Sequence, residues 1–483
     1  MMNPETFRQM SLAAVDLAQD HLGGMRERAV YRPLKPDERR ALLEQPLADD
    51  GRDPRAILEL FRDAVLPHPM GNGHPRFFGW VNSPPAPIGA VADYLAAAMN
   101  PSCAGGDHAA IYVERAATRW LMELVGFPVA GSMGLLVSGT SVASIVALAA
   151  ARQRAAAAQG WDIRADGLQG ARPRLRLYVS PEGHSCLRKA AELLGLGSSA
   201  VRIIPVDETF GMDVAALRDA IAADRRAGDL PFCVAASAGT VGTGAIDPLA
   251  AIAEVCERER LWFHVDGAYG ALGVLAGTAR SAFAGMERAD SLALDPHKWL
   301  SVPVECGCAL VRDGALLRET FSLVPPYLRT EEGKGIGGLP WFSEYGVQQT
   351  RGFRALKLWM VLQHLGRRGV TALVERHVAL AHDLARAIDA APDLERLAPV
   401  PLSIVAFRCV PSALQGDDAR LDALNKRVME ELQSGGEAFV TNTLVRGRFA
   451  LRACVLHYAT TADDVAALVD LVRRTGAALT RSV

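Results

Sequence analysis

The chain has 483 residues, half of them hydrophobic, and a formal net charge of −2 at pH 7. This near balance of charge argues against a general affinity for nucleic acid or for anionic membrane surfaces, so partners have to be inferred from particular sites. At about 150 residues per domain, the length allows roughly three units, or one large α/β domain with smaller ones.

The amino-terminal stretch from Met1 to Asp20 mixes charged and apolar side chains and lacks the apolar core of a signal peptide. The sequence has no apolar run of the ~18 residues that a membrane span needs, so the cytoplasm is the expected compartment. The eight cysteines are scattered and form no CxxC pair. We interpret them as small core residues rather than disulfides or metal ligands, and we expect no metal site.

The first 75 residues have a helical pattern, with turns at residues 31–33 and 66–69. So few amphipathic helices make little core of their own, and this segment is expected to pack on something else. A proline-rich connection at 79–85 and a helix at about 87–99 follow. The next loop, 100–108, is rich in Gly, Pro, Asn and Ser, the kind of loop in which binding groups gather.

The middle of the chain alternates strand-like and helix-like segments, which indicates a mostly parallel sheet covered on both faces. No helical pattern separates the last two apolar runs, which leaves room for one antiparallel strand. Ligands of such sheets bind beyond the carboxyl ends of the strands. The expected strands are 134–137, 175–179, 201–206, 232–236, 261–265, 291–294 and 307–311, and the expected helices are about 142–158, 184–194, 213–224 and 247–259. A helix at 355–365 then opens a third unit, with strands at 403–408 and 449–454.

Lys298 stands out because it follows a short apolar run, Ser291 to Leu294, that stops at Pro296. Beside the ring of Trp299 and at the end of a buried strand, loss of water would disfavour the charged form of the lysine. The amine would then be free to form a Schiff base with an aldehyde. The alternative interpretation is an ordinary surface lysine on a loop.

Asp266 ends a second apolar run, and the small residues Gly267 and Ala268 after it let a flat ligand approach the backbone. An aspartate in this place can keep a ring nitrogen protonated. Pyridoxal phosphate (PLP) needs both a lysine for its aldehyde and an acid opposite its pyridinium nitrogen.

The chain resembles the aromatic-L-amino-acid decarboxylase family, the group II PLP-dependent decarboxylases. The resemblance rests on Asp295-Pro-His-Lys-Trp299, His264-Val-Asp-Gly-Ala-Tyr269 and His74-Pro-Arg-Phe-Phe78. It implies the α/β fold type I of PLP-dependent transferases (aspartate-aminotransferase-like), with a large mostly parallel seven-stranded sheet domain, an N-terminal helical flap exchanged across a homodimer and a small C-terminal α/β domain. The predicted boundaries are 1–78, 79–354 and 355–483, and the active site would lie at the subunit interface.

The stretch from Gly134 to Ser141 predicts a strand, a tight turn and a helix start that can cradle a phosphate, although Ser and Thr at such a place are also common caps. No GxGxxG or GxxxxGK[ST] motif competes with it. His184 matches the ring-stacking histidine of the family and can take either charge state near neutral pH, or it is a helix-cap residue. The resemblance assigns catalysis to Lys298 and His184, and cofactor binding to Thr140, Ser141, His184, Thr240, Asp266, Ala268, His297 and Lys298.

The substrate pocket is less sharply defined by the sequence. The resemblance implies substrate contacts from Trp80, Ser83 and Ser102; Trp80 suggests an aromatic wall. Asn100, Ser102, Asp107 and His108 suggest a more polar pocket, and the last two could instead cap a helix. An aromatic L-amino acid is the leading expectation, with acidic and diamino substrates open.

The expected reaction is decarboxylation of an L-amino acid to the amine and carbon dioxide. A glycine-rich loop at 325–350 could close over the site. The family carries a tyrosine proton donor there, and Tyr345 is the candidate, but the role is not carried over to it because this loop is shorter. Val241 stands where the family usually has a second threonine. Alternatives are decarboxylation with oxidative deamination to an aldehyde, transamination with Arg452 as the carboxylate clamp, or a non-catalytic binding protein that has kept the fold.

Overall fold

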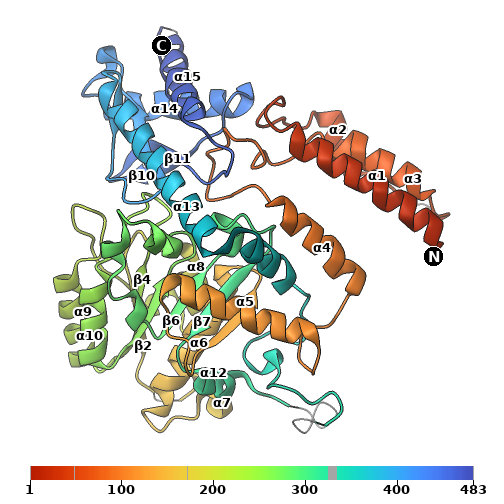
Figure 1. Cartoon of the computed structure of the whole chain (residues 1–483). Coiled ribbons are helices and arrows are strands. Elements are labelled where there is room, and N and C mark those ends of the chain that lie inside the picture. The colour runs from red at the N-terminus through yellow and green to blue at the C-terminus, as the bar shows by residue number, and fades with distance from the viewer. Residues whose placement is uncertain (1, 48, 171, 325–333, 482–483) are drawn as a thin grey trace. The chain divides into compact units, whose positions relative to one another are not determined.

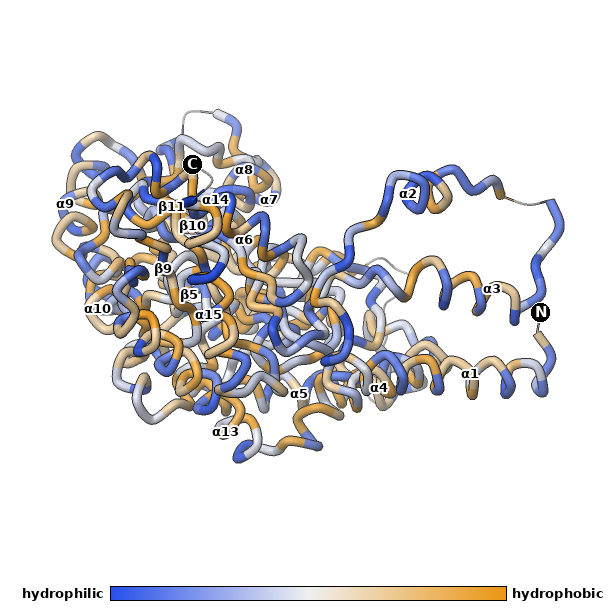
Figure 2. The backbone as a smooth tube through the Cα atoms, turned by 90° about the horizontal axis from the view of Figure 1, so that it is seen from above, coloured by the Kyte–Doolittle hydropathy of each residue, from blue (hydrophilic) through white to orange (hydrophobic). Residues whose placement is uncertain are grey.

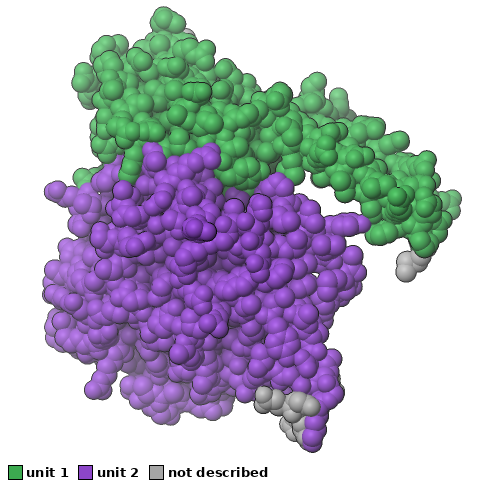
Figure 3. Space-filling model, in the orientation of Figure 1, with its two compact units in different colours: residues 1–84, 380–397, 405–483 green, residues 85–379, 398–404 purple. Residues whose placement is uncertain are grey.

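The protein is described from a computed structural model that covers residues 2–47, 49–170, 172–324 and 334–481. The chain forms two compact units, which Figure 3 colours separately. Unit 1 comprises residues 1–84, 380–397 and 405–483, and unit 2 comprises residues 85–379 and 398–404. The three-part division predicted from the sequence stays a prediction.

Unit 2 is built on a seven-stranded sheet in the order β1-β7-β6-β5-β4-β2-β3. β2, β4, β6 and β7 of this sheet are labelled in Figure 1. β7 runs antiparallel to both of its neighbours, and the other paired strands are parallel. The predicted mostly parallel sheet is therefore confirmed, together with the one antiparallel strand. The strands are β1 (Met133–Val137), β2 (Leu175–Val179), β3 (Val201–Ile203), β4 (Leu230–Ser237), β5 (Trp262–Asp266), β6 (Ser291–Leu294) and β7 (Gly307–Val311).

The helices of unit 2 cover this sheet on both faces, and every residue of β1, β2, β5, β6 and β7 is buried. α6 is rich in alanine, and these small side chains let it lie close against β4 to β7. The helices are α4 (Pro87–Met99), α5 (Ala109–Val125), α6 (Thr140–Ala157), α7 (Ile163–Asp166), α8 (Ser185–Leu193), α9 (Val214–Arg226), α10 (Leu249–Glu259), α11 (Pro296–Trp299) and α12 (Gly314–Phe321). α13 (Ala355–Ala390) is interrupted at Gly366, one residue after the predicted helix end.

Unit 1 joins the amino-terminal helices to a small four-stranded sheet in the order β10-β11-β9-β8. β10 pairs antiparallel with β11, and β8 with β9. The elements are α1 (Pro4–Gly23), α2 (Pro36–Leu43), α3 (Pro54–Leu60), β8 (Leu394–Arg396), β9 (Ile404–Cys409), α14 (Asp418–Gly435), β10 (Thr441–Val445), β11 (Arg448–Cys454) and α15 (Ala462–Thr480). Among the described residues, no helix is both long and apolar enough to span a lipid bilayer.

All eight cysteines are buried and free, as predicted. Burial raises the pKa of the thiols, for example to about 11 at Cys103 and about 12 at Cys306. They stay protonated near neutral pH and pack as small apolar side chains.

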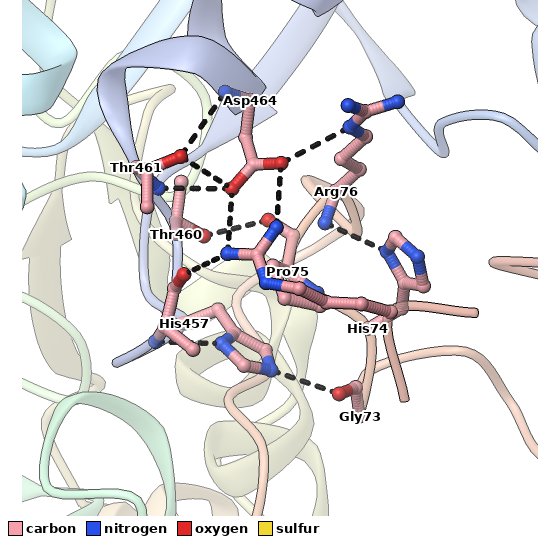
Figure 4. Close-up of polar contacts among 10 residues, drawn as sticks. Gly73, His74, Pro75, Arg76, His457, Thr460, Thr461 and Asp464 are labelled. Carbon is pink, nitrogen blue, oxygen red and sulfur yellow. Dashed lines mark hydrogen bonds and ion pairs between the residues drawn. The ribbon is translucent and has the colours of Figure 1, made fainter. Parts of the chain in front are cut away.

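The His74-Pro-Arg-Phe-Phe78 segment is fixed within unit 1 by a buried carboxylate, Asp464, in the first turn of α15 (Figure 4). Asp464 accepts two hydrogen bonds of 3.0 Å from Arg26 and one of 3.0 Å from Arg76. Beside it, Thr460 donates to the carbonyl of Pro75 at 2.6 Å. Burial opposes ionisation of Asp464, but the bonds from Arg26, Thr461 and Arg76 outweigh it and hold its pKa at about 2.

We expect Asp464→Asn to lower the free energy of unfolding of unit 1 by about 1.5–3 kcal/mol at neutral pH, because charged hydrogen bonds are lost. The folded pKa lies below the unfolded value of about 3.9, so this stabilisation is present above about pH 4 and is lost as the pH falls toward 2. Urea unfolding at several pH values should show wild type and variant converging at low pH. The exposed neighbour provides the control, Asp463→Asn, and an equal loss in both variants would contradict the assignment.

Candidate active site

The site lies where the carboxyl ends of the parallel strands meet at one edge of the unit 2 sheet. β5 and β6 are adjacent there, with Asp266 aligned with Ala293. The Asp295 N–H donates to the carbonyl of Ala268 at 3.1 Å, which ties the two strand ends together. The predicted lysine and aspartate segments thus come together although they are separate in the sequence.

Lys298 lies on the short helix α11 and its amine forms an ion pair with Asp295, at 2.9 Å from Nζ to Oδ2. The other oxygen of Asp295 accepts a hydrogen bond of 2.8 Å from the backbone N–H of Thr140. The amine therefore has to leave this ion pair before it can act as the nucleophile expected from the sequence.

Trp299 is fully buried. Its ring stacks on Tyr269 with centroids 5.0 Å apart, and its Nε1 donates to Nδ1 of His377 at 3.1 Å. The expectation that this ring removes water from the lysine amine stays a prediction.

Asp266 is buried at the end of β5 and accepts a hydrogen bond of 3.1 Å from the N–H of Ala268. Burial raises the pKa of Asp266, and the positive charge of Lys298 opposes this shift. An acid shielded from water in this way interacts strongly with a positively charged ring nitrogen.

The predicted phosphate cradle falls on the first turn of α6. Its cap position is Gly139, which has no side chain, so Thr140 and Ser141 do not serve as the cap residue. The hydroxyl of Thr140 is buried and has no hydrogen-bond partner among the described residues, whereas Ser141 is exposed. A Cβ at Gly307 would come within 2.4 Å of the Gly139 Cα, so β7 needs a glycine where it passes the turn.

His184 is the cap residue of α8, as one of its two interpretations predicted. Its Nδ1 accepts a hydrogen bond of 3.2 Å from the N–H of Cys186. The neutral ring therefore carries its proton on Nε2. His184 is exposed, and its stacking on a ligand ring stays a prediction.

Thr240 is buried in the turn after β4, and its hydroxyl closes that turn. It lies 3.1 Å from the hydroxyl of Thr243 and accepts from the N–H of Ala245 at 3.1 Å. Val241, in the place of the second threonine of the family, is partly exposed. The structure thus gives Thr240 a local structural role in addition to its predicted cofactor contact.

His297 and Ala268 also lie at this edge. Nδ1 of His297 is 2.7 Å from the carbonyl oxygen of Cys306, and its Nε2 is 3.8 Å from Asp295. Burial lowers the pKa of His297, which keeps the ring neutral near pH 7. Ala268 is half-buried.

The predicted substrate residues are divided between the units. Ser102 is exposed in unit 2, and its carbonyl oxygen is 3.2 Å from Nε2 of His108. Trp80 in unit 1 is half exposed, and Ser83 is buried there. His108 is the cap position of α5 but makes no capping bond with its side chain, and Asp107 accepts a hydrogen bond from Tyr112.

Part of the predicted closing loop, residues 325–333, lies outside the described residues. Tyr345, further along, is buried, and its ring lies 5.6 Å below the guanidinium of Arg115. Arg115 in turn donates to the carbonyl of Pro340 at 3.0 Å. Tyr345 is therefore fixed to the body of unit 2.

Arg351 and Glu114 are among the buried charged groups of unit 2 that the sequence interpretation missed. Arg351 pairs with Glu114, and it also donates to the carbonyls of Cys103 and Leu136 at 2.8 and 2.7 Å. It thus anchors the 100–108 loop to β1. A charged residue within an apolar pattern is the sequence signal for such a pair, but it does not name the partner.

Comparisons with known proteins agree with this geometry. The family profile described as "Pyridoxal-dependent decarboxylase conserved domain" matches residues 36–410. The aromatic-L-amino-acid decarboxylase of Bacillus atrophaeus is 33% identical over 96% of this chain and 94% of its own length. Tryptophan decarboxylase 1 of Oryza sativa subsp. japonica is 31% identical over 98% of this chain and 94% of its own length. The crystal structure of Oryza sativa TDC with PLP and tryptamine has a TM-score of 0.91, 29% identity and 99% coverage of each chain.

The sheet topology and these matches define a PLP-dependent enzyme of fold type I. The chain belongs to the pyridoxal-dependent decarboxylase family, and it is a carboxy-lyase acting on an amino acid. The site fits the cofactor. It offers a partly exposed lysine amine, a buried acid one strand away, and an unpartnered buried hydroxyl at the amino end of a helix.

We expect Thr140→Val to weaken PLP binding about tenfold, because one charge-assisted hydrogen bond to the phosphate is lost. The thermal stability of the cofactor-free protein should not fall, since the hydroxyl has no partner in the described structure. PLP titration and thermal unfolding measure the two effects. As a control, Thr240→Val should destabilise the cofactor-free protein by removing the bonds to Thr243 and Ala245. If Thr140→Val binds PLP as tightly as the wild type, the prediction that Thr140 holds the phosphate is wrong.

Proposed function

We propose that the protein decarboxylates an aromatic L-amino acid to the amine and carbon dioxide. The observation that carries the proposal is the placement of Lys298 and Asp266 at the ends of adjacent parallel strands. Relatives named as aromatic-L-amino-acid and tryptophan decarboxylases, similar over nearly the whole chain, support an aromatic substrate. Trp80, Ser83 and Ser102 are the proposed substrate contacts, and the exposed indole of Trp80 suits an aromatic side chain.

The proposed roles follow from the surroundings of each residue. PLP, when bound, supplies an electron sink for the bond that breaks at the α-carbon. Lys298 would hold the cofactor through its aldehyde group. Asp266, shielded from water, would keep the ring nitrogen protonated, while Thr140 and Ser141 would hold the phosphate. His184, with its proton on Nε2, would lie against the cofactor ring and is the proposed source of the proton that replaces carbon dioxide.

The protein is further proposed to act as a homodimer in the cytoplasm, with the active site at the subunit interface. α1, α2 and α3 have no buried residue, although they carry large apolar side chains. Figure 2 shows apolar and polar stretches alternating along α1 and α3. Exposed examples are Phe7, Leu12, Val15, Ile57 and Phe61. Apolar surface of this extent is stabilised when a second copy covers it.

A second candidate function is decarboxylation with oxidative deamination to an aldehyde. The observation in its favour is the burial of Tyr345 under Arg115, which separates this tyrosine from a role as mobile proton donor. If the α-carbon of the substrate is protonated slowly after carbon dioxide leaves, it has time to react with oxygen. Transamination is less favoured, because Arg452, its predicted carboxylate clamp, is buried in β11 and donates to Thr441.

The test is to incubate the enzyme with the twenty L-amino acids and common diamino acids, and to measure carbon dioxide, hydrogen peroxide and ammonia separately. We expect carbon dioxide from aromatic substrates without peroxide or ammonia. Peroxide with ammonia would select the aldehyde-forming reaction instead. Borohydride should fix PLP to Lys298, and Lys298→Ala should abolish both the label and the activity. The exposed Lys189→Ala is the control and should keep both.

The proposed dimer can be tested separately. Phe7→Asp combined with Phe61→Asp should shift the protein toward the monomer in analytical ultracentrifugation, because a charge is expensive to bury in an apolar contact. Leu47→Asp changes a fully exposed residue outside the helices and should leave the oligomeric state unchanged. A wild-type protein that sediments as a monomer would contradict the proposal.

A further inference from the structure

Asp295 connects the lysine to the phosphate cradle. It is buried at the end of β6, with Oδ2 2.9 Å from the Lys298 amine and Oδ1 2.8 Å from the first N–H of α6. Each oxygen thus has its own partner, one on either side of the carboxyl group. Such an arrangement fixes the orientation of the carboxylate and the position of the amine.

A carboxylate in this place is not suited to bind the phosphate itself, because both are negatively charged. Its two oxygens instead contact groups of positive character, the Lys298 amine and the amino end of α6. When the lysine is bonded to PLP, its nitrogen cannot remain a free ammonium group beside Asp295. The ammonium–carboxylate pair seen here therefore belongs to the free lysine, which exists before PLP attaches and while substrate occupies the cofactor.

We propose that Asp295 is a positioning residue that receives the Lys298 amine whenever it is not bonded to PLP and holds it as an ammonium group against the first turn of α6. This inference rests on the proposed role of Lys298 as the residue that carries the cofactor. Attachment then requires the ammonium group to lose one proton. The neutral amine condenses with the aldehyde, forming a C=N bond and releasing one water. While substrate is bound, the retained proton keeps Lys298 from competing with it.

Other ionisable groups lie around the pair, and a change in their charge could also affect attachment of PLP. They are Asp266 on β5, His297 on α11, Cys186 on α8, Cys306 before β7, and Lys357 on α13. Burial keeps the two thiols protonated and His297 neutral near pH 7, and Lys357 is paired with Asp93. Asp266 is common to the wild type and the variants below. A difference between them therefore reports on Asp295.

The first test uses Asp295→Asn, which keeps an oxygen to accept from Thr140 and removes the charge. Cofactor-free protein is mixed with saturating PLP at a series of pH values, and the fraction attached to Lys298 is trapped with borohydride over time. We expect attachment at pH 7 to be faster in the variant by roughly tenfold, because the amine is no longer held by a close opposite charge.

Asp290→Asn is the matched control. Asp290 lies at the other end of β6, accepts a backbone N–H from Phe263 at 2.8 Å and pairs with Arg154 at 2.8 Å. Its loss should lower stability without changing the rate of attachment. The same attachment rate in wild type and Asp295→Asn would overturn the inference. Absence of label on Lys298 in the wild type would instead overturn the proposed function.

A second test needs no cofactor. Lys298→Met leaves Asp295 buried without its cation, so the cofactor-free variant should melt at a lower temperature than the wild type at pH 7. The double variant Lys298→Met with Asp295→Asn should recover part of that loss, because the unpaired charge is gone. If the effects of the two substitutions on the melting temperature are simply additive, the ion pair does not exist in solution and the inference fails.

Discussion

The parallel direction of the central strands is the constraint on which the site depends. β1, β2, β4, β5 and β6 run the same way, so their carboxyl ends lie at one edge of the sheet. Residues as far apart in the sequence as Thr140 and Lys298 are therefore brought to one place, where Asp295 contacts both. The antiparallel β7 fits between β1 and β6 without disturbing this edge, because Gly307 lets it pass the turn before α6.

Buried charges with defined partners hold the parts of each unit in position. Glu114 and Arg351 fix a loop to β1 in unit 2, and Asp464 fixes the amino-terminal segment in unit 1. Loss of one partner from such a pair leaves an uncompensated charge, which costs more than the pair contributes. Asp295 and Lys298 differ from these pairs, because the proposed role of Lys298 requires their contact to break and form again.

Local patterns do not show the contacts of several side chains, which the tertiary structure makes clear. Trp299 follows Lys298 in sequence, and its ring stacks on Tyr269 in the core. Tyr345 follows a glycine-rich stretch, and Arg115 covers its ring. The contacts of Asp295 cannot be read from the motif Asp295-Pro-His-Lys-Trp299, since a sequence does not show which acid faces which amine.

The sequence by itself determined the family, the cofactor and the seven strands. Apolar runs of strand length and a short lysine motif are local features, which can be recognised without knowledge of the fold. It also placed Lys298 and Asp266 at strand ends. Only the tertiary structure decided the strand order, the ion pair of Lys298 with Asp295, the unpartnered hydroxyl of Thr140 and the hydrogen bonds of Thr240. These features depend on the distance and orientation of groups from separate segments, which only the packing of the folded chain fixes.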